Sequence, residues 1–318
     1  MRINFVMSNT VSSGIFNAII KEFKKYIPRD YELFVTEHPL DNVDIYHYHR
    51  PNLETELRCN SVVTVHHDLE DTDPWFDASQ FIDMYHQANK IICLNNEQKK
   101  ILLINEDLDN TIVIPHGINK NLFSNSERYV KPEEKFKIGI ISKRYGRRVK
   151  GEAYLHELYK RLDVNNVKFY FVGESRTIDA YEVHELGFEA EVYEYLPYNL
   201  FDEIYNEIDI LLVPSLFEGG PANIPEALYT RTPILGREIG MIKDLLIEGV
   251  NGYFLSGNIE KDAILLNLLI NDKNNIFKNL IDNINKNTPK VYSWKEVVEQ
   301  HISVYKEVLK KEEIIDND

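Results

Sequence analysis

Cysteine is scarce in this sequence, and long apolar runs are missing from it. The two cysteines, Cys59 and Cys93, lie far apart in the chain. They indicate no disulfide framework, so a reducing cytoplasm is the expected setting. No run approaches the roughly eighteen apolar residues of a membrane-spanning helix. The opening stretch, Met1–Met7, is too short for a signal peptide and predicts a first strand.

Positive charge is also in deficit. The chain has 36 Lys and Arg against 51 Asp and Glu, a net charge of −15. A nucleic-acid partner requires a basic face, so nucleic acid is excluded as the main partner. The length of 318 residues and the hydrophobic fraction of 43% suit a large core divided between two domains of ordinary size.

Short apolar runs alternate with segments of helical periodicity along the chain. This alternation predicts an α/β protein with parallel sheets, whose ligands gather at the carboxyl ends of the strands. The expected strands are Ile3–Met7, Tyr31–Val35, Val43–Tyr48, Ser61–Val65, Lys90–Leu94, Thr111–Ile114, Phe136–Ile141, Val167–Val172, Val192–Tyr195 and Ile208–Val213. The expected helices include Ile15–Tyr26, Trp75–Gln87, Asn96–Ile104, Leu200–Glu207 and Tyr292–Lys310.

A polar segment without periodicity, Lys120–Lys135, separates two such series and predicts an inter-domain linker. We therefore expect a first domain over residues 1–130, a second over 131–290 and a final helical segment over 291–318.

The stretch Pro214–Leu228 organises the second series. It follows the apolar run Ile208–Val213 and leads into a helix through a turn with two glycines and two prolines. A Gly-rich turn between a strand and a helix favours phosphate, because backbone N–H groups point outward there. Glu218 and Glu226 bracket this turn with seven residues between them. Carboxylates accept hydrogen bonds from sugar hydroxyls, so the pattern indicates a nucleotide diphosphate sugar.

A basic loop follows the first strand of the same series. It places five cations within eight residues of an acidic protein: Lys143, Arg144, Arg147, Arg148 and Lys150. Concentrated positive charge of this kind attracts an anionic ligand.

The run from Asp209 to Phe254 resembles the retaining GT-B glycosyltransferases of glycosyltransferase family 4. Glu218 to Glu226 matches their Glu-x7-Glu signature, and Thr232–Leu235 and Glu248–Phe254 are also similar. The resemblance implies two Rossmann-like domains with parallel sheets facing across a cleft, and a last helix that crosses back to the first domain. It also implies metal-independent transfer of a hexose, with retention, from a nucleotide diphosphate sugar. We expect UDP as the nucleotide and a glycan or lipid-linked acceptor in surface polysaccharide synthesis.

The same resemblance assigns roles to individual residues. Arg144 and Lys150 would clamp the diphosphate, Glu226 would bind the ribose, and Glu218 and His66 would contact the transferred sugar. Since histidine is doubled at this strand end, the register between His66 and His67 stays open. Further donor contacts are expected from the nucleotide-base region and from the two turns, at Gly14, Leu196, Gly219, Gly220, Pro221, Ala222 and Asn223. Where the family has several glycines in its first loop, this chain has only Gly14 after two serines.

Other readings stay open at this point. His47 and His49 with His66-His67-Asp68 could form a metallohydrolase site, and Asp71-Thr72-Asp73 is similar to the metal-binding Asp-x-Asp of GT-A enzymes. A GT-B epimerase or a non-catalytic nucleotide-sugar-binding protein would share the donor site. We expect no metal cofactor, because no consistent ligand set is evident. The basic turn Lys21, Lys24 and Lys25 would be either a solvated face or a peripheral contact with the inner face of a membrane.

Overall fold

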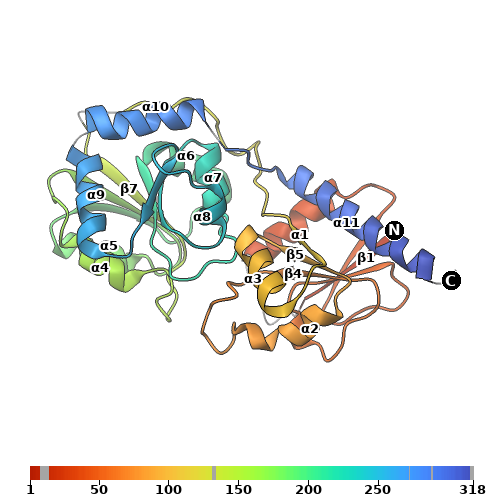
Figure 1. The fold of residues 1–318 in the computed structure, drawn as a ribbon. Helices are drawn as coiled ribbons and strands as arrows, with labels where there is room; N and C mark the ends of the chain where they lie inside the picture. The colour runs from red at the N-terminus through yellow and green to blue at the C-terminus, as the bar shows by residue number, and fades with distance from the viewer. Residues whose placement is uncertain (8–13, 131–133, 272, 288, 316–318) are drawn as a thin grey trace. The chain divides into compact units, whose positions relative to one another are not determined.

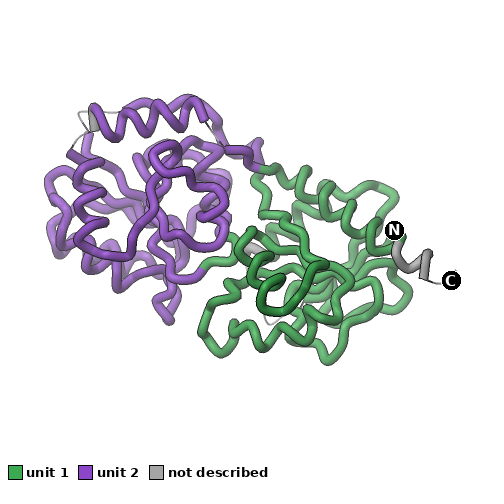
Figure 2. Tube along the Cα trace, viewed as in Figure 1, with its two compact units in different colours: residues 1–118, 218–220, 292–318 green, residues 119–217, 221–291 purple. Residues whose placement is uncertain are grey.

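The chain folds into two compact units (Figure 1, Figure 2). The computed structural model describes residues 1–7, 14–130, 134–271, 273–287 and 289–315. Unit 1 comprises Met1–Ile118, Glu218–Gly220 and Tyr292–Asp318, and unit 2 comprises Asn119–Phe217 and Pro221–Val291.

Unit 1 is built on a six-stranded sheet in the order β2-β1-β3-β4-β5-β6, with every neighbouring pair parallel. Its strands are β1 (Arg2–Val6), β2 (Glu32–Thr36), β3 (Ile45–Tyr48), β4 (Ser61–Val65), β5 (Lys90–Cys93) and β6 (Thr111–Val113). The chain turns to one side of β1 to form β2 and to the other side to form β3. The carboxyl ends of β1 and β3 are therefore the switch point where ligands of open α/β sheets bind.

Helices cover both faces of this sheet, as a parallel sheet requires. α1 (Gly14–Tyr26) and α11 (Trp294–Ile315) pack with Phe5 in one apolar core, and Figure 1 shows the two helices together. The opposite core contains Val6 and Leu102 and joins the sheet to α2 (Ile82–Gln87) and α3 (Asn96–Glu106). Successive strand residues thus enter opposite cores, as the two-residue period of a strand dictates. Short 3-10 turns cover Pro51–Leu53 and Ala78–Gln80.

Unit 2 has a second six-stranded parallel sheet in the order β12-β11-β10-β7-β8-β9. Its strands are β7 (Phe136–Ile141), β8 (Val167–Val172), β9 (Glu189–Tyr193), β10 (Ile210–Val213), β11 (Ile234–Arg237) and β12 (Gly252–Leu255). This is the doubly wound order of dinucleotide-binding domains, and its switch point lies between β7 and β10.

Seven α-helices connect or follow these strands within the described part of unit 2. They are α4 (Glu152–Tyr159), α5 (Thr177–Glu185), α6 (Phe201–Glu207), α7 (Asn223–Tyr229), α8 (Gly240–Leu245), α9 (Ile259–Asn271) and α10 (Lys278–Lys286). A 3-10 turn at Tyr198–Leu200 precedes α6, and a π-helical turn at Lys273–Phe277 joins α9 to α10. Side chains of α4, α9 and α10 share one apolar core with β7 and β8.

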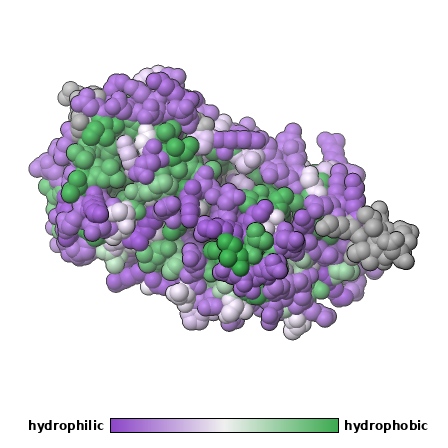
Figure 3. All heavy atoms as spheres, viewed as in Figure 1, coloured by the Kyte–Doolittle hydropathy of each residue, from purple (hydrophilic) through white to green (hydrophobic). Residues whose placement is uncertain are grey.

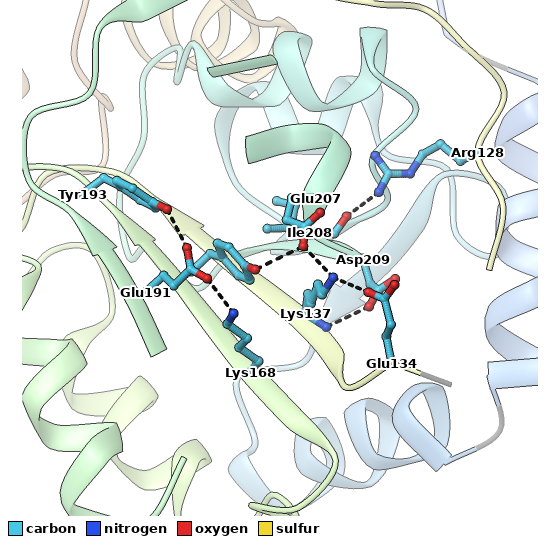
Figure 4. A network of polar contacts seen from close by, with 10 residues as sticks. Arg128, Glu134, Lys137, Lys168, Glu191, Tyr193, Glu207, Ile208 and Asp209 are labelled. Carbon is cyan, nitrogen blue, oxygen red and sulfur yellow. Dashed lines mark hydrogen bonds and ion pairs between the residues drawn. The ribbon is translucent and has the colours of Figure 1, made fainter. Parts of the chain in front are cut away.

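The expected linker belongs largely to unit 2, so the division falls after Ile118 rather than after residue 130. Arg128 is the physical reason. Its guanidinium donates to the Tyr205 carbonyl (2.7 Å), to Thr232 Oγ1 (2.9 Å) and to the Ile208 carbonyl. Figure 4 shows Arg128 beside the polar network of Lys137, Glu207 and Asp209 at the start of the sheet. These bonds hold the segment on unit 2 although its described residues form no helix or strand. Pro132, which the linker prediction used, lies outside the described residues.

Two element boundaries differ from expectation because polar side chains compete with the pattern. The helix expected over Trp75–Gln87 begins only at Ile82. Asp73 and Asp77 accept hydrogen bonds from the Trp75 and Ser79 N–H groups (both 2.9 Å), which forms turns instead of helix.

The strand expected over Val192–Tyr195 is β9, shifted to Glu189–Tyr193. It is an edge strand that includes charged residues, as edge strands commonly do. Glu191 pairs with Lys168 (2.5 Å) on the neighbouring strand, and Figure 4 shows this contact. β11 and β12 were not expected as strands, although their residues lie in segments that carry the family resemblance.

The surface in Figure 3 is mostly hydrophilic, with apolar side chains in separate groups. In the described part of the chain, no helix combines the length and the apolar character needed to cross a membrane.

Candidate active site

The switch point of unit 2 brings the two sequence motifs to one edge of its sheet. The basic loop leaves the carboxyl end of β7, and the Gly/Pro turn leaves the carboxyl end of the adjacent β10. The Leu216 N–H donates to the Val149 carbonyl (2.8 Å), which joins the two loops directly. The sheet order therefore places Lys150 near the residues that precede α7.

Gly151 lets these loops approach each other. Its backbone has a φ of +80°, which is the left-handed region, and it caps the N-terminus of α4. A Cβ at this position would collide with the Pro214 carbonyl oxygen and would lie 2.9 Å from the Pro214 carbonyl carbon. Only glycine fits both the backbone angle and the space.

We expect Gly151→Ala to lower stability by at least about 1–2 kcal/mol from the left-handed backbone alone. Thermal unfolding measures the loss, which corresponds to roughly 2–4 °C per kcal/mol for a unit of this size. Gly146→Ala is the matched control in the same loop, since a Cβ there meets nothing within 4 Å. Equal melting temperatures for the two variants would contradict the close approach.

Arg144 is held by a buried carboxylate that the sequence did not reveal. Its Nη1 lies 2.7 Å from Asp179 Oδ1, and Asp179 is 1% exposed. Asp179 also accepts from Nη1 of Arg176 (3.0 Å), whose Nε donates to the Ser142 carbonyl (2.7 Å). Both arginines are thereby fixed at the carboxyl end of β7. Arg144 contributes one N–H to Asp179, and a guanidinium has five to give.

The other cations of the loop differ in their surroundings. Lys143 is exposed and pairs with Glu174 (2.5 Å), whereas Lys150 is half-buried and lies over the Tyr145 ring (5.7 Å to the centroid). Arg147 and Arg148 are exposed.

The turn after β10 is tied to β7 through Asn223. Its Nδ2 donates to the Ile141 carbonyl (2.8 Å), the last residue of β7. α7 begins at Asn223, with Ala222 as the preceding cap residue and Pro221 before it. The backbone of these three residues therefore lies at the same sheet edge as the basic loop.

Glu226 is buried in α7 between two tyrosine hydroxyls. Tyr198 donates to its Oε1 (2.6 Å) and Tyr205 to its Oε2 (2.7 Å). Burial raises the pKa of the Glu226 carboxyl to about 7, and the two hydroxyl donors oppose that shift. Sequence reasoning missed both tyrosines. Tyr198 lies in the 3-10 turn before α6 and Tyr205 in α6 itself, so no pattern within one element pointed to Glu226.

Leu196 lines a hollow of about 380 Å³ in unit 2. Val172, Gly173, Glu194, Tyr195, Pro197 and Phe201 complete its walls. The hollow lies at the carboxyl end of β8, next to the strand that carries the basic loop. Its apolar wall suits the flat face of a base.

In unit 1, buried histidine rings line the carboxyl ends of β3 and β4. His49 Nδ1 and His66 Nε2 lie 2.9 Å apart, and His47 contacts the Tyr305 hydroxyl and the Thr64 hydroxyl (both 2.7 Å). Burial lowers the pKa of His49 to about 3 and of His116 to about 4, and holds the pKa of His66 well below its ordinary value. The rings are therefore neutral at pH 7.

The structure separates His66 from His67. His67 is 5% exposed and stacks on Phe81 in the core, with ring centroids 4.0 Å apart. His66 is more exposed and stacks edge-on with Phe16. No group of three or more His, Cys, Asp or Glu in the described ranges is placed to hold a metal ion.

Glu218, Gly219 and Gly220 belong to unit 1. The Glu218 N–H donates to Asp68 Oδ2 (3.0 Å), and Asn95 Nδ2 donates to the Gly219 carbonyl (2.7 Å). A Cβ on Gly219 would lie 2.7 Å from the His66 carbonyl oxygen. This part of the signature is thus placed beside His66. Gly14 is the first residue of α1, and the loop before it lies outside the described residues.

Two six-stranded parallel sheets of this construction define the GT-B class of glycosyltransferase folds. HepE of Anabaena, solved with UDP and glucose, has this fold with a TM-score of 0.71, 15% identity and coverage of 96% of this chain and all of that one. The lipopolysaccharide outer core galactosyltransferase WaaB gives 0.69, 14% identity and coverage of 96% and 99%.

The chain belongs to the family of glycosyl transferases group 1, which residues 124–291 match. An uncharacterized glycosyltransferase of Methanocaldococcus jannaschii, MJ1178, is 26% identical over 227 residues, or 70% of this chain and 60% of the relative. A second relative from that organism is matched over 42% of its own length. The chain thus spans about half the length of these curated relatives.

Proposed function

We propose that this protein transfers a sugar from a nucleotide diphosphate sugar, with retention, in the manner of glycosyltransferase family 4. The observation that carries the proposal is the switch point of unit 2. There the cationic loop of β7 meets the turn of β10, and the buried Glu226 carboxylate follows that turn. An anion and a pair of hydroxyls are the ligand groups that such a site binds. A diphosphate joined to ribose provides both.

UDP is the proposed nucleotide, and a glycan or lipid-linked acceptor in surface polysaccharide synthesis is the proposed second substrate. The solved complex of HepE contains UDP, which supports the nucleotide. The lipopolysaccharide galactosyltransferase WaaB, with the same fold, supports the class of acceptor.

Each residue then has a role in the reaction. Departure of UDP leaves an oxocarbenium-like sugar, so negative charge grows on the leaving phosphate. Arg144 and Lys150 stabilise that charge, with the N–H groups of Ala222 and Asn223. Pro221 has no N–H and shapes the turn only.

The remaining contacts hold the two ends of the donor. Glu226 accepts from the ribose hydroxyls and Leu196 faces the base. Glu218 and His66 contact the transferred sugar, while Gly14, Gly219 and Gly220 allow the backbone to approach it. The leaving phosphate takes the proton of the acceptor hydroxyl.

Donor binding is proposed to need no divalent metal. Cationic side chains take the place of the metal ion, so UDP affinity measured by calorimetry is expected to be the same with and without EDTA. A tenfold loss of affinity on chelation would contradict this proposal. Product analysis then separates the activities, because transfer requires an acceptor. An epimerase would release free sugar without one, and a binding protein would turn nothing over.

The pKa of Glu226 predicts how UDP affinity depends on pH. Its folded pKa of about 7 lies above the ordinary 4.5, so the carboxyl is protonated below pH 7 and ionised above it. The ionised form accepts hydroxyls better, so affinity should rise by up to about tenfold from pH 6 to pH 8. The stability that the neutral buried form contributes is fully present below about pH 4.5 and is lost as the pH rises from there to about 7.

Glu226→Gln provides the matched control for this pH profile. The terminal phosphate of UDP also titrates, near pH 6, in wild type and variant alike. The difference between the two profiles therefore reports Glu226 alone. Parallel profiles would show that the carboxyl does not titrate in this range or does not contact the ligand.

A further inference from the structure

Arg50 lies at the switch point of unit 1, two residues beyond the end of β3. It follows His49, whose ring contacts His66, the residue just after β4. The position corresponds in its own sheet to that of the Gly/Pro turn after β10 in unit 2. A charged side chain here lies where an open parallel sheet binds its ligand.

The guanidinium of Arg50 lies over two aromatic rings. Its Cζ is 5.4 Å from the centroid of Phe16 and 5.7 Å from that of Phe76. Two ring faces favour a cation and restrict the plane of the guanidinium. They offer no oxygen atom to its N–H groups.

No hydrogen bond or ion pair links the Arg50 side chain to any residue in the described ranges, and its Nε is buried without a partner. The Nε of Arg237 in unit 2 is likewise buried without a partner, but two other arginines of that unit differ. Arg176 donates to Ser142 and Asp179, and Arg128 donates to two carbonyls and a hydroxyl. Leaving a buried donor unpaired is costly, so an unpaired guanidinium at a ligand-binding edge indicates a missing acceptor.

The histidine rings around Arg50 carry no charge. His49, His66 and His67 are neutral, and the charge of Arg50 helps to keep the pKa of each below its ordinary value. Asp71 acts on the His67 ring and accepts a hydrogen bond from the Asp73 N–H (3.0 Å). The three histidines thus contribute no charge of their own beside Arg50.

We propose that Arg50 anchors an oxyanion site in unit 1, which binds a phosphate or carboxylate group of the acceptor. The planar fork of arginine matches either anion with two parallel hydrogen bonds. This inference rests on the proposed function, because only that function identifies the bound anion as part of an acceptor. It adds that the acceptor is anionic and that Arg50 selects it.

The test titrates two small probes, methyl phosphate and acetate, against the full chain at constant ionic strength. Saturating UDP is present to occupy the cationic loop of unit 2. Binding is followed by the rise in melting temperature, from which a Kd is obtained. The variants are R50Q, which removes the charge, R50K, which keeps the charge without the fork, and R29Q, an exposed arginine of unit 1 as control.

We expect at least one probe to bind wild type and R29Q equally, with a Kd at least tenfold weaker in R50Q and an intermediate Kd in R50K. The probe that binds more tightly identifies the anion as phosphate or carboxylate. Equal affinities in wild type and R50Q for both probes, no binding of either probe to wild type, or an equal loss in R29Q would overturn the proposal.

Two measurements keep the test independent of folding and of the donor proposal. If R50Q fails to fold, R50K decides alone, and a wild-type Kd in R50K overturns the oxyanion site. UDP affinity is measured in the same samples. A wild type that binds no UDP contradicts the proposed function, while the difference between wild type and R50Q still tests Arg50.

Discussion

Lys150→Ala should slow sugar transfer by about 10²–10³-fold, or roughly 2.7–4 kcal/mol of transition-state stabilisation, because one preorganised group that stabilises the leaving phosphate is lost. Its melting temperature should stay within about 2 °C of wild type, since a half-buried lysine over a tyrosine ring contributes little to folding. Steady-state kinetics and thermal unfolding on the same preparation measure both quantities.

Lys143→Ala is the matched control, because Lys143 lies in the same loop and pairs with an exposed glutamate. A surface pair of this kind contributes about 0–1 kcal/mol to stability. We expect nearly wild-type activity from it. If both lysine variants lose activity equally, the loop acts through its total charge and Lys150 has no particular role.

Arg144→Ala should reduce both activity and stability. The lost activity should be similar to that of Lys150→Ala, but the variant also deprives the buried Asp179 of one of its two arginine partners. Weakening the pairing of a buried acceptor costs about 1–3 kcal/mol of folding free energy. The contrast between the two variants separates the electrostatic role of this loop from its structural role. A stable, inactive Arg144→Ala would show that Arg176 alone satisfies Asp179.

Glu226→Gln should weaken UDP binding by roughly 10 to 100-fold, since a charge-assisted hydrogen bond is worth about 1.5–3 kcal/mol. The amide also changes what the two tyrosine hydroxyls can donate to, because one of its ends no longer accepts. Calorimetry with UDP measures the loss. Tyr205→Phe tests the support directly, because it keeps the carboxylate and removes one donor. Tyr205→Phe should weaken UDP binding less than Glu226→Gln does.

Glu218→Gln is expected to leave UDP affinity nearly unchanged while it weakens the intact donor or slows its transfer. The reason is that Glu218 is assigned to the sugar, which UDP lacks. Calorimetry of Glu218→Gln and Glu226→Gln, each with UDP and with the intact donor, measures the four affinities to be compared with wild type. Wild-type UDP affinity in both variants would reject the ribose assignment of Glu226. Loss of UDP affinity in Glu218→Gln alone would reverse the two roles.

The sequence by itself determined the class of the fold and the order of its elements. Periods of two and 3.6 residues marked most strands and helices, because those periods follow from backbone geometry alone. The Glu218 to Glu226 signature and the cation cluster after β7 were also visible, since each lies within one short stretch. Strands whose residues were polar or few, such as β9 and β11, escaped this reasoning or shifted within it.

Only the tertiary structure decided which side chains meet. Asp179 reaches Arg144 from α5, and Tyr198 and Tyr205 reach Glu226 from the turn before α6 and from α6 itself. The hydrogen bonds that Arg128 makes to unit 2 and the unpaired Nε of Arg50 likewise depend on the folded chain. These facts arise from contacts between residues distant in sequence, for which neither periodicity nor composition carries information. Burial then sets the pKa of Glu226, because a carboxyl loses its hydration only when the surrounding elements close around it.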